Sequence, residues 1–173
     1  MSETNGLTGA QKGTAIHYVM QKFMPFAGMT EDSVAEFIAQ LENKGELSKE
    51  EANAVNPKDI IDFYNTELGQ RIMKSNKVVR EAPFEIEIPA STVYETDGDE
   101  KILLQGIIDC YFYEGDEIVI VDYKSDFYTS IDDITQKYRI QLEYYRLAVE
   151  KICKKSVKNS FLYLFLTKSV IQC

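Results

Sequence analysis

The chain has 173 residues, 45% of them hydrophobic and 12% aromatic, which is enough to bury the core of one domain. It contains no apolar run near the roughly 20 residues that cross a bilayer, and its first residues lack the basic and apolar segments of a signal peptide. The net charge of -9 counts against a nucleic-acid partner without excluding one, because carboxylates are also needed around catalytic metal ions.

Residues 8–76 are predicted to form a helical N-terminal part. A first helix is expected over residues 8–24, where apolar residues recur at helical spacing and Pro25 ends the pattern. Thr30 can cap a second helix, and Gly45 follows the end of its apolar stripe.

Three shorter helices are expected in the rest of this part. Ser48 and Glu51 have the spacing of a capping box, which predicts a short third helix. Asn56 is a suitable N-cap with Pro57 at the first helical position, and another short helix is expected after Leu68.

Strands are expected in the second part of the chain, residues 77–173. The stretch 78–90 alternates in part, with Phe84 and Ile86 on one face and glutamates on the other. The segment E-T-D-G-D-E at 95–100 carries the Asp-Gly signal of a hairpin turn.

Two further strands are expected at 101–113 and 117–126, joined by a turn at 114–116. Residues 130–155 hold the clearest helical pattern of the chain, with a serine cap, and 159–167 form a last apolar strand. This order of elements predicts an α/β domain in which helices flank a mixed central sheet.

Both strands of the central hairpin carry a carboxylate inside an apolar run. A hairpin centred on residues 115 and 116 places Asp109 roughly opposite Asp122, and Lys124 shares the face of Asp122 because side chains repeat every two residues along a strand. Two carboxylates this close repel each other unless a cation or a proton lies between them. The pattern is typical of a site for a hard divalent cation with an ammonium group beside it.

A simple salt bridge at the end of the sheet would also explain these charges. In that interpretation Lys124 pairs with Asp122, while Asp109 is exposed to solvent. The apolar runs before both carboxylates favour burial instead, and Gly106 suits a close approach of backbone or ligand. The sequence therefore favours a metal site over a surface ion pair.

Four short motifs follow one another along the chain: G-T-A-I-H at 13–17, G-I-I-D at 106–109, D-Y-K at 122–124 and Q-L-E-Y-Y at 141–145. The ordered set resembles the signature of the PD-(D/E)xK nuclease superfamily in its RecB-like branch. It is most similar to the C-terminal nuclease domain of AddA-type subunits of bacterial AddAB helicase–nucleases. The resemblance implies a restriction-endonuclease-like core and one nuclease domain over residues 1–173.

The resemblance also implies roles for individual residues. His17, Asp109, Asp122 and the backbone carbonyl of Tyr123 are the implied metal ligands. Lys124 is the implied catalytic lysine, acting together with Asp109 and Asp122. Without the resemblance, a lone histidine on a largely apolar helix is more often a core residue.

Gln141 and Tyr145 lie one helical turn apart and are implied to orient the lysine or to contact DNA. The alternative is a core tyrosine with a glutamine that faces solvent. Glu81 and Glu85 are weaker candidates, because most glutamates of this strand are expected to be solvated. Phosphate contacts or ordinary surface charge can explain the remaining basic residues, Lys22, Lys74, Lys77, Arg80, Lys137 and Arg139.

The chain departs from the family in two respects. Its three scattered cysteines cannot hold the four-cysteine iron–sulfur cluster of some members, so no such cluster is expected, and they fit the reducing cytoplasm. It also lacks a G-x-x-x-x-G-K-[ST] phosphate loop, which indicates an excised nuclease domain or a stand-alone relative without ATPase activity.

The expected function is exonuclease-type hydrolysis of phosphodiester bonds in DNA during double-strand-break repair and recombination. The resemblance implies Mg²⁺ as cofactor, with Mn²⁺ as a substitute, and single-stranded DNA as substrate. Its implied partners are a helicase part of the same parent chain and an AddB-like subunit. The alternatives are a non-catalytic module that binds DNA or a partner, an RNase, and a stand-alone RecB-like or CRISPR-associated exonuclease.

Overall fold

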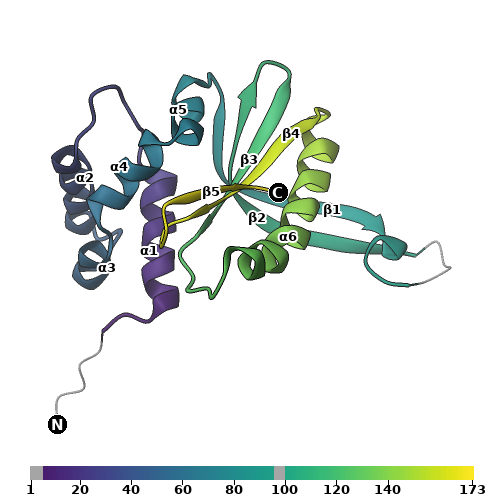
Figure 1. Cartoon of the computed structure of the whole chain (residues 1–173), viewed down its shortest axis with the longest axis horizontal. Helices are drawn as coiled ribbons and strands as arrows, with labels where there is room; N and C mark the ends of the chain where they lie inside the picture. The colour runs from purple at the N-terminus through teal and green to yellow at the C-terminus, as the bar shows by residue number, and fades with distance from the viewer. Residues whose placement is uncertain (1–5, 96–99) are drawn as a thin grey trace, which may run out of the picture.

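The computed structural model describes residues 6–95 and 100–173, so the predicted turn at 95–100 lies mostly outside the described residues. In this part of the chain the helices come first and the sheet follows (Figure 1). The helices are α1 (Gly9–Lys22), α2 (Glu31–Asn43), α3 (Lys49–Ala54), α4 (Pro57–Asn65), α5 (Glu67–Lys74) and α6 (Ile131–Cys153). The strands are β1 (Val78–Pro89), β2 (Lys101–Glu114), β3 (Glu117–Lys124), β4 (Val157–Leu164) and β5 (Ser169–Gln172), with a 3₁₀ turn (Ala90–Thr92) after β1.

Local capping explains where the helices begin. Thr30 and Ser48 form capping boxes, and Asn56 accepts a hydrogen bond from the backbone amide of Lys58, which confirms the three predicted caps. The last helix of this part begins at Glu67, slightly earlier than expected, because Thr66 caps it. No helix in the described ranges is long and apolar enough to cross a membrane.

The strands form one mixed sheet in the order β1-β2-β3-β4-β5. The β3–β4 pair is parallel and is joined through α6, whereas the other neighbours are antiparallel. This arrangement confirms the predicted fold class of a mixed sheet flanked by helices. The prediction of a single strand after α6 was wrong, because the four-residue edge strand β5 also pairs with β4. So short a strand leaves little alternation to detect in the sequence.

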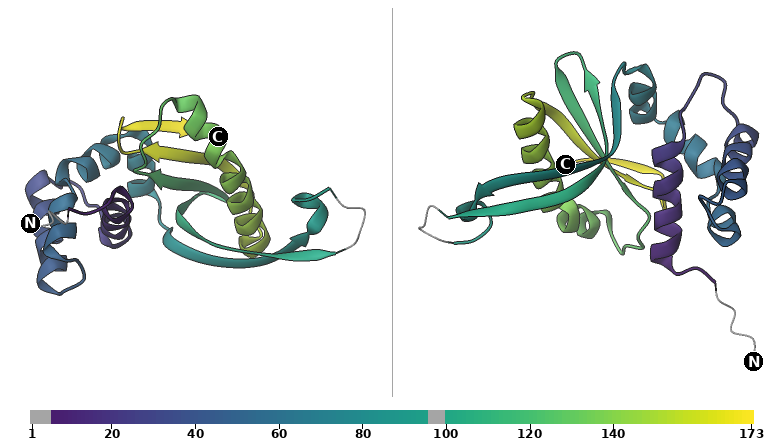
Figure 2. Two further views of the ribbon diagram at one scale, coloured as in Figure 1. Left: turned by 90° about the horizontal axis from the view of Figure 1, so that it is seen from below. Right: turned by 180° about the vertical axis from the view of Figure 1, so that it is seen from behind.

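Helices cover both faces of the sheet (Figures 1 and 2). The N-terminal helices pack on one face, where Val119 and Val121 of β3 contribute to the core. Helix α6 packs on the other face, against Ile118 and Ile120 of the same strand. Because alternate residues of β3 are buried on opposite faces, the strand reads as a continuous apolar run.

The faces of β1 and β2 exchange sides at one point. Ile108 packs in the core beneath α6, whereas Cys110, two residues later, packs with the N-terminal helices. On the neighbouring strand, Glu81 interrupts the pairing and has a φ of 48°, a left-handed conformation that is uncommon for a residue with a side chain. Beyond this point β1 and β2 stay paired with each other and extend past β3 as a long two-stranded arm of the sheet (Figure 1).

Candidate functional site

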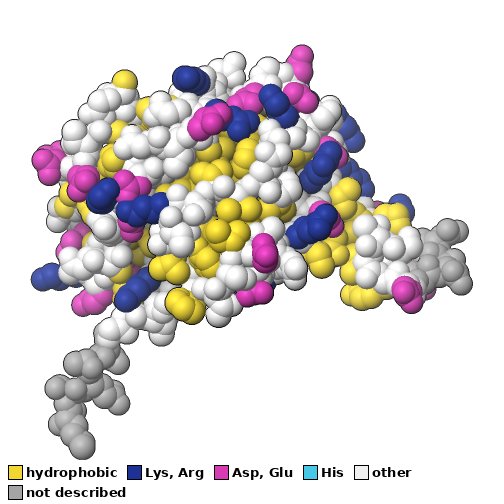
Figure 3. Space-filling model, viewed as in Figure 1, with side chains coloured by type: hydrophobic (Ala, Val, Ile, Leu, Met, Phe, Trp, Pro, Cys, Tyr) yellow, Lys and Arg dark blue, Asp and Glu magenta, His cyan; other side chains and the backbone are white. Residues whose placement is uncertain are grey.

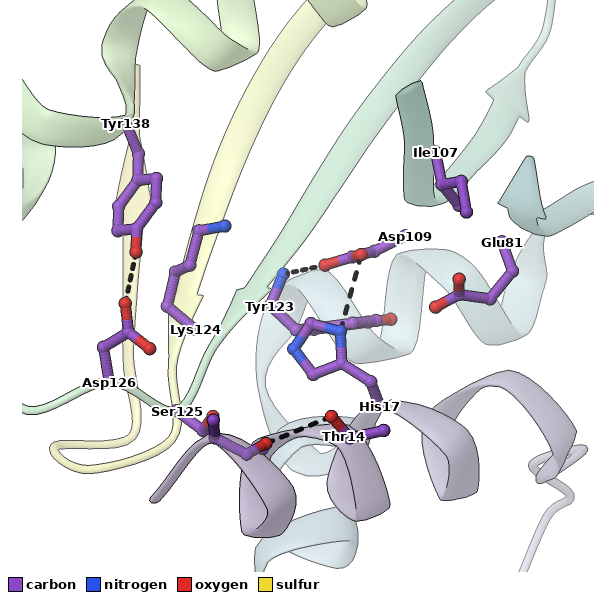
Figure 4. Close-up of a pocket in the computed structure, with 12 residues that line it drawn as sticks. Thr14, His17, Glu81, Ile107, Asp109, Tyr123, Lys124, Ser125, Asp126 and Tyr138 are labelled. Carbon is purple, nitrogen blue, oxygen red and sulfur yellow. Dashed lines mark hydrogen bonds and ion pairs between the residues drawn. The ribbon is translucent and has the colours of Figure 1, made fainter. Parts of the chain in front are cut away.

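A cleft of about 430 Å³ opens where α1 approaches the middle of β2 and the end of β3 (Figure 4). His17 reaches it from α1, Glu81 from β1 and Asp109 from β2. Lys124 is the last residue of β3 and lies on the opposite wall of the cleft. Among the described residues, Lys124 is the only lysine or arginine that lines this cleft, whereas several carboxylates do.

Three side chains meet in the cleft at distances that suit a shared cation. One ligand atom from each of His17, Glu81 and Asp109 lies within 4.8 Å of the other two. The Nδ1 atom of His17 is 3.5 Å from Oδ1 of Asp109. Carboxylate oxygens and a ring nitrogen are ligands for divalent metal ions, so this cluster can hold one.

Asp109 is fixed by the backbone of the neighbouring strand. The β2–β3 ladder ends with the pair Cys110 and Val121, and Oδ2 of Asp109 then accepts a hydrogen bond of 2.7 Å from the Tyr123 amide. The carboxylate thus replaces the main-chain partner that the separating strands no longer supply. Its other oxygen is left facing His17.

Asp122 lies deeper, and its side chain is only 1% exposed. The Nζ atom of Lys124 is 2.7 Å from Oδ2 of Asp122, yet neither carboxylate oxygen accepts a hydrogen bond of good geometry from the described residues. Burial and the nearby charge of Asp109 raise the pKa of Asp122 to about 7, against the opposing effect of Lys124. A buried carboxylate with so few donors is costly unless another cation compensates it.

Helix α6 holds Lys124 from the other side. The Nζ atom donates to Oε1 of Gln141 at 3.1 Å, and Nε2 of Gln141 donates to the hydroxyl of Tyr145 at 2.7 Å. The ammonium group also lies 3.9 Å from the centre of the Tyr138 ring. Gln141 therefore contacts the lysine instead of facing solvent, while Tyr145 also belongs to the apolar core.

The carboxylates also change the titration of the histidine. Burial lowers the pKa of His17, but the ion pair with Asp109, helped by Asp122 and Glu81, outweighs burial and raises it. Burial and the charge of Asp109 raise the pKa of Glu81, while His17 acts against this shift. Such coupled shifts are typical of functional sites.

The structure divides the residues singled out in the sequence into two contiguous sets. His17 and Asp109 meet in the cleft, whereas Asp122 is connected through Lys124, on the opposite wall of the cleft, to Gln141 and Tyr145 of α6. Tyr123 lies between the sets: its amide binds Asp109 and its ring is buried against the N-terminal helices.

Glu81 belongs to the site more closely than its sequence indicated. In a regular strand it shares a face with Glu85, which is exposed and hydrogen-bonded to Gln105. The face change at Glu81 turns its carboxylate into the cleft instead. Alternation alone could not reveal this, because the signal is a break in the strand rather than a residue pattern.

The outlying basic residues show no common surface at the cleft. Arg80 is partly buried; burial lowers its pKa, but the neighbouring Tyr64 and Cys110 outweigh burial and raise it. Lys137 pairs with Asp126 at 3.3 Å, and Arg139 pairs with the glutamate one helical turn further on. Surface ion pairing explains Arg139 without a ligand.

Comparison with known proteins gives one consistent family. Residues 2–171 match the model described as the PD-(D/E)XK nuclease superfamily. The chain is 39% identical over 177 residues to the A subunit of the ATP-dependent helicase/nuclease of Clostridium botulinum (strain Hall), covering 99% of this chain and 14% of the relative. The protein of the same name from Clostridium kluyveri is 40% identical over 170 residues, covering 95% of this chain and 14% of that relative.

The similarity therefore concerns a small part of these longer proteins. The chain spans about 14% of the length of the curated relatives it matches. Among solved structures, the alignment with SSO0001 covers 96% of this chain and 75% of the SSO0001 chain, at 12% identity. The TM-score of 0.37 is too low for a comparison of sites.

The raised pKa of Asp122 predicts how pH affects stability. Because folding raises this pKa from 3.8 to about 7, the folded state binds the proton more tightly, and the metal-free protein loses stability as pH rises between these values. We expect Asp122→Asn to stabilise the metal-free protein at about pH 8 by roughly 1–3 kcal/mol and to have less effect at about pH 4. Thermal unfolding at both pH values measures this.

The control for this experiment is Asp116→Asn, at a carboxylate whose side chain is 99% exposed. It is expected to leave unfolding at pH 8 nearly unchanged. A destabilised Asp122→Asn at that pH would show that the buried carboxylate is already compensated without a metal ion.

Gly13 predicts a second effect. A Cβ atom at this position would lie 2.5 Å from Oγ of Ser125, so a larger residue at position 13 must displace either the serine hydroxyl or α1. We expect Gly13→Ala to move His17 away from Asp109 and thereby to lower the pKa of the histidine. NMR titration measures this pKa without an assignment problem, since His17 is the only histidine in the sequence.

Adding Ser125→Ala tests the cause of this change. It removes the clashing oxygen and leaves the Ser125 Cβ position 3.8 Å from the new methyl group, an ordinary contact. The double variant is therefore expected to recover the wild-type titration. An unchanged histidine pKa in Gly13→Ala would rule out the proposed role of this close approach.

Proposed function

Because the chain belongs to the PD-(D/E)XK nuclease superfamily, we propose that it is a Mg²⁺-dependent deoxyribonuclease that hydrolyses phosphodiester bonds in the cleft beside His17. The observation that carries this proposal is the buried pair of Asp122 and Lys124, next to the carboxylate of Asp109. A binding module has no need of a buried, poorly compensated carboxylate at this position. A nuclease needs it to hold a cation against a phosphate.

The donor set suits a hard divalent cation. We assign the cluster of His17, Asp109 and Glu81 as ligands, and we propose Asp122 and the backbone carbonyl of Tyr123 as further ones. Mg²⁺ and Mn²⁺ both accept such oxygen-rich sites, and Oδ1 of Asp122, the oxygen that is not paired with Lys124, is one that a cation would compensate. When bound, the ion polarises the scissile phosphate and promotes ionisation of the attacking water.

Lys124 is the proposed catalytic lysine. Its ammonium group is held between Asp122 and Gln141, so it points into the cleft with little freedom to move (Figure 4). From there it orients the attacking water and stabilises negative charge that develops on the phosphate. Gln141 and Tyr145 position the lysine through their hydrogen-bond chain.

We also propose that residues 1–173 act as one nuclease domain, with a helical part at 8–76 and a catalytic core at 77–173. Helix α1 supplies His17 to a site whose other members come from the sheet. Removal of the helical part would therefore remove a ligand as well as one layer of the core.

The names of the relatives suggest the biological setting. They are helicase/nuclease subunits, and this chain matches only a short part of each. We propose that the chain is the nuclease part of an AddA-type subunit, paired with an AddB-like subunit. It would act as an exonuclease on unwound single strands during double-strand-break repair in the cytoplasm.

Substitution of the buried pair tests the activity. We expect Asp122→Ala and Lys124→Ala to lower Mg²⁺-dependent cleavage of single-stranded DNA by about 10²–10⁴-fold. Lys124→Ala should still bind Mn²⁺ in calorimetry, because the lysine is not a ligand, whereas Asp109→Asn should lose binding.

Lys155→Ala is the control for the lysine, since it removes an exposed ion pair far from the cleft. It should leave the cleavage rate unchanged. Wild-type rates in either Asp122→Ala or Lys124→Ala would refute the catalytic assignment, and unchanged Mn²⁺ binding in Asp109→Asn would favour a non-catalytic module.

Whether Glu81 is a metal ligand can be tested separately, because Glu85 on the same strand provides a matched control. We expect Glu81→Gln to weaken Mn²⁺ binding at least about tenfold, because it removes a charged ligand from the cluster. Glu85→Gln changes an exposed glutamate outside the cluster and should leave the affinity unchanged. Calorimetry on folded samples compares the two, and equal affinities would remove Glu81 from the site.

A further inference from the structure

A second, smaller hollow adjoins the cleft. It has a volume of about 230 Å³ and is formed by the loop after β3 and the first turns of α6. The two hollows share Asp126, so they lie next to each other on the surface. Pockets that enclose a whole small ligand usually measure roughly 300–1,000 Å³, so this hollow suits a single planar group.

Phe127 forms one side of this hollow and is 84% exposed. Its neighbours are tethered on both sides: Asp126 accepts a hydrogen bond from the hydroxyl of Tyr138, and the Tyr128 hydroxyl is hydrogen-bonded to Thr167. The loop is thus anchored while the phenyl ring is presented to solvent. On the face shown in Figure 3, hydrophobic side chains reach the surface where this loop lies.

The charges around the ring favour a nucleotide over an apolar ligand. Lys137 lines the hollow with a side chain that is 63% exposed, and the start of α6 contributes its partial positive charge. Asp126 is paired with Lys137 and accepts a hydrogen bond from Tyr138. The Asp133 carboxylate accepts a hydrogen bond from the Thr129 hydroxyl, while its backbone amide donates to Ser130 at the helix cap. Lys137 is the cation that lines this hollow, and a phosphate that binds it takes the place of Asp126, whose carboxylate lies 3.3 Å from its Nζ atom.

We propose that Phe127 is a stacking platform for one base of a single strand whose scissile phosphate lies in the cleft. This inference rests on the proposed nuclease function and adds a binding position for the substrate. Lys137 contacts the phosphate that follows this base. Stacking on an aromatic ring accepts every base, so the site selects an unpaired nucleotide rather than a sequence.

Paired DNA does not satisfy this site. A base inside a duplex has both faces covered by its neighbours, and it reaches Phe127 only after unstacking. The ring therefore favours single strands, or strand ends that fray, over intact duplex. This preference arises from the loop and is independent of the metal ligands.

The test combines Phe127→Ala with abasic substrates. Affinity is measured by fluorescence anisotropy with Ca²⁺ in place of Mg²⁺, using labelled single-stranded oligodeoxynucleotides that carry one abasic residue at successive positions. For the wild-type chain, one position is expected to lose about tenfold in affinity when its base is absent. Phe127→Ala should lose about tenfold on the intact strand and show no further loss at that position.

Two variants separate stacking from a structural effect. Phe127→Trp should restore both the affinity and the sensitivity to the abasic residue, since it preserves an aromatic face. Tyr94→Ala removes another exposed aromatic residue, 63% exposed, after β1, and should bind all substrates like the wild type.

The outcomes distinguish this inference from the nuclease proposal. If the wild-type chain cleaves and binds single strands but Phe127→Ala retains the same abasic sensitivity, the stacking platform is refuted. The same holds if Phe127→Ala alters only the assembly of the chain with a protein partner. If the wild-type chain neither binds nor cleaves DNA, the nuclease proposal fails as well.

Discussion

The repulsion between the carboxylates of Asp109 and Asp122 is the constraint on which the rest of the site depends. Both charges lie inside or at the edge of the core, where the low dielectric strengthens repulsion and makes an uncompensated charge costly. The structure compensates them from three directions: a backbone amide and His17 at Asp109, and Lys124 at Asp122. The compensation is incomplete, since the pKa of Asp122 remains raised. A divalent cation bound beside the two carboxylates would compensate the remaining negative charge.

The shape of the sheet follows from the same region. The exchange of faces at Glu81 and Asp109 lets β2 separate from β3, so the Asp109 side chain rather than a main-chain carbonyl receives the Tyr123 amide. The separation also opens the space that α1 enters with His17. A left-handed conformation at Glu81 costs of order 1–3 kcal/mol, and the packing of both cores maintains it. The strained backbone of Glu81 thus lies where its side chain departs from the regular alternation of the strand.

Much of this arrangement could be predicted from the sequence, because it depends on local rules. The helix caps follow from single hydrogen bonds, and the midpoint of the hairpin gives the register that the β2–β3 pairs confirm. Other features depend on contacts between distant segments. Glu81 was judged by the alternation of its strand, which the face change breaks, and β5 is too short to show a period. The contact of Gln141 with Lys124 required the placement of α6 over β3.

The net charge of -9 is a poor guide to the ligand of this chain, because the acidic residues have different tasks in different places. Some are paired with lysines or arginines at the surface, as Glu143 is with Arg139, and have little influence at long range. Those in the cleft are close together, and their local field attracts a cation rather than repelling a substrate. A divalent ion held there would neutralise much of this negative charge and offer its own charge to a phosphate oxygen. An acidic protein can then attract a phosphate at the one point where its carboxylates are most concentrated.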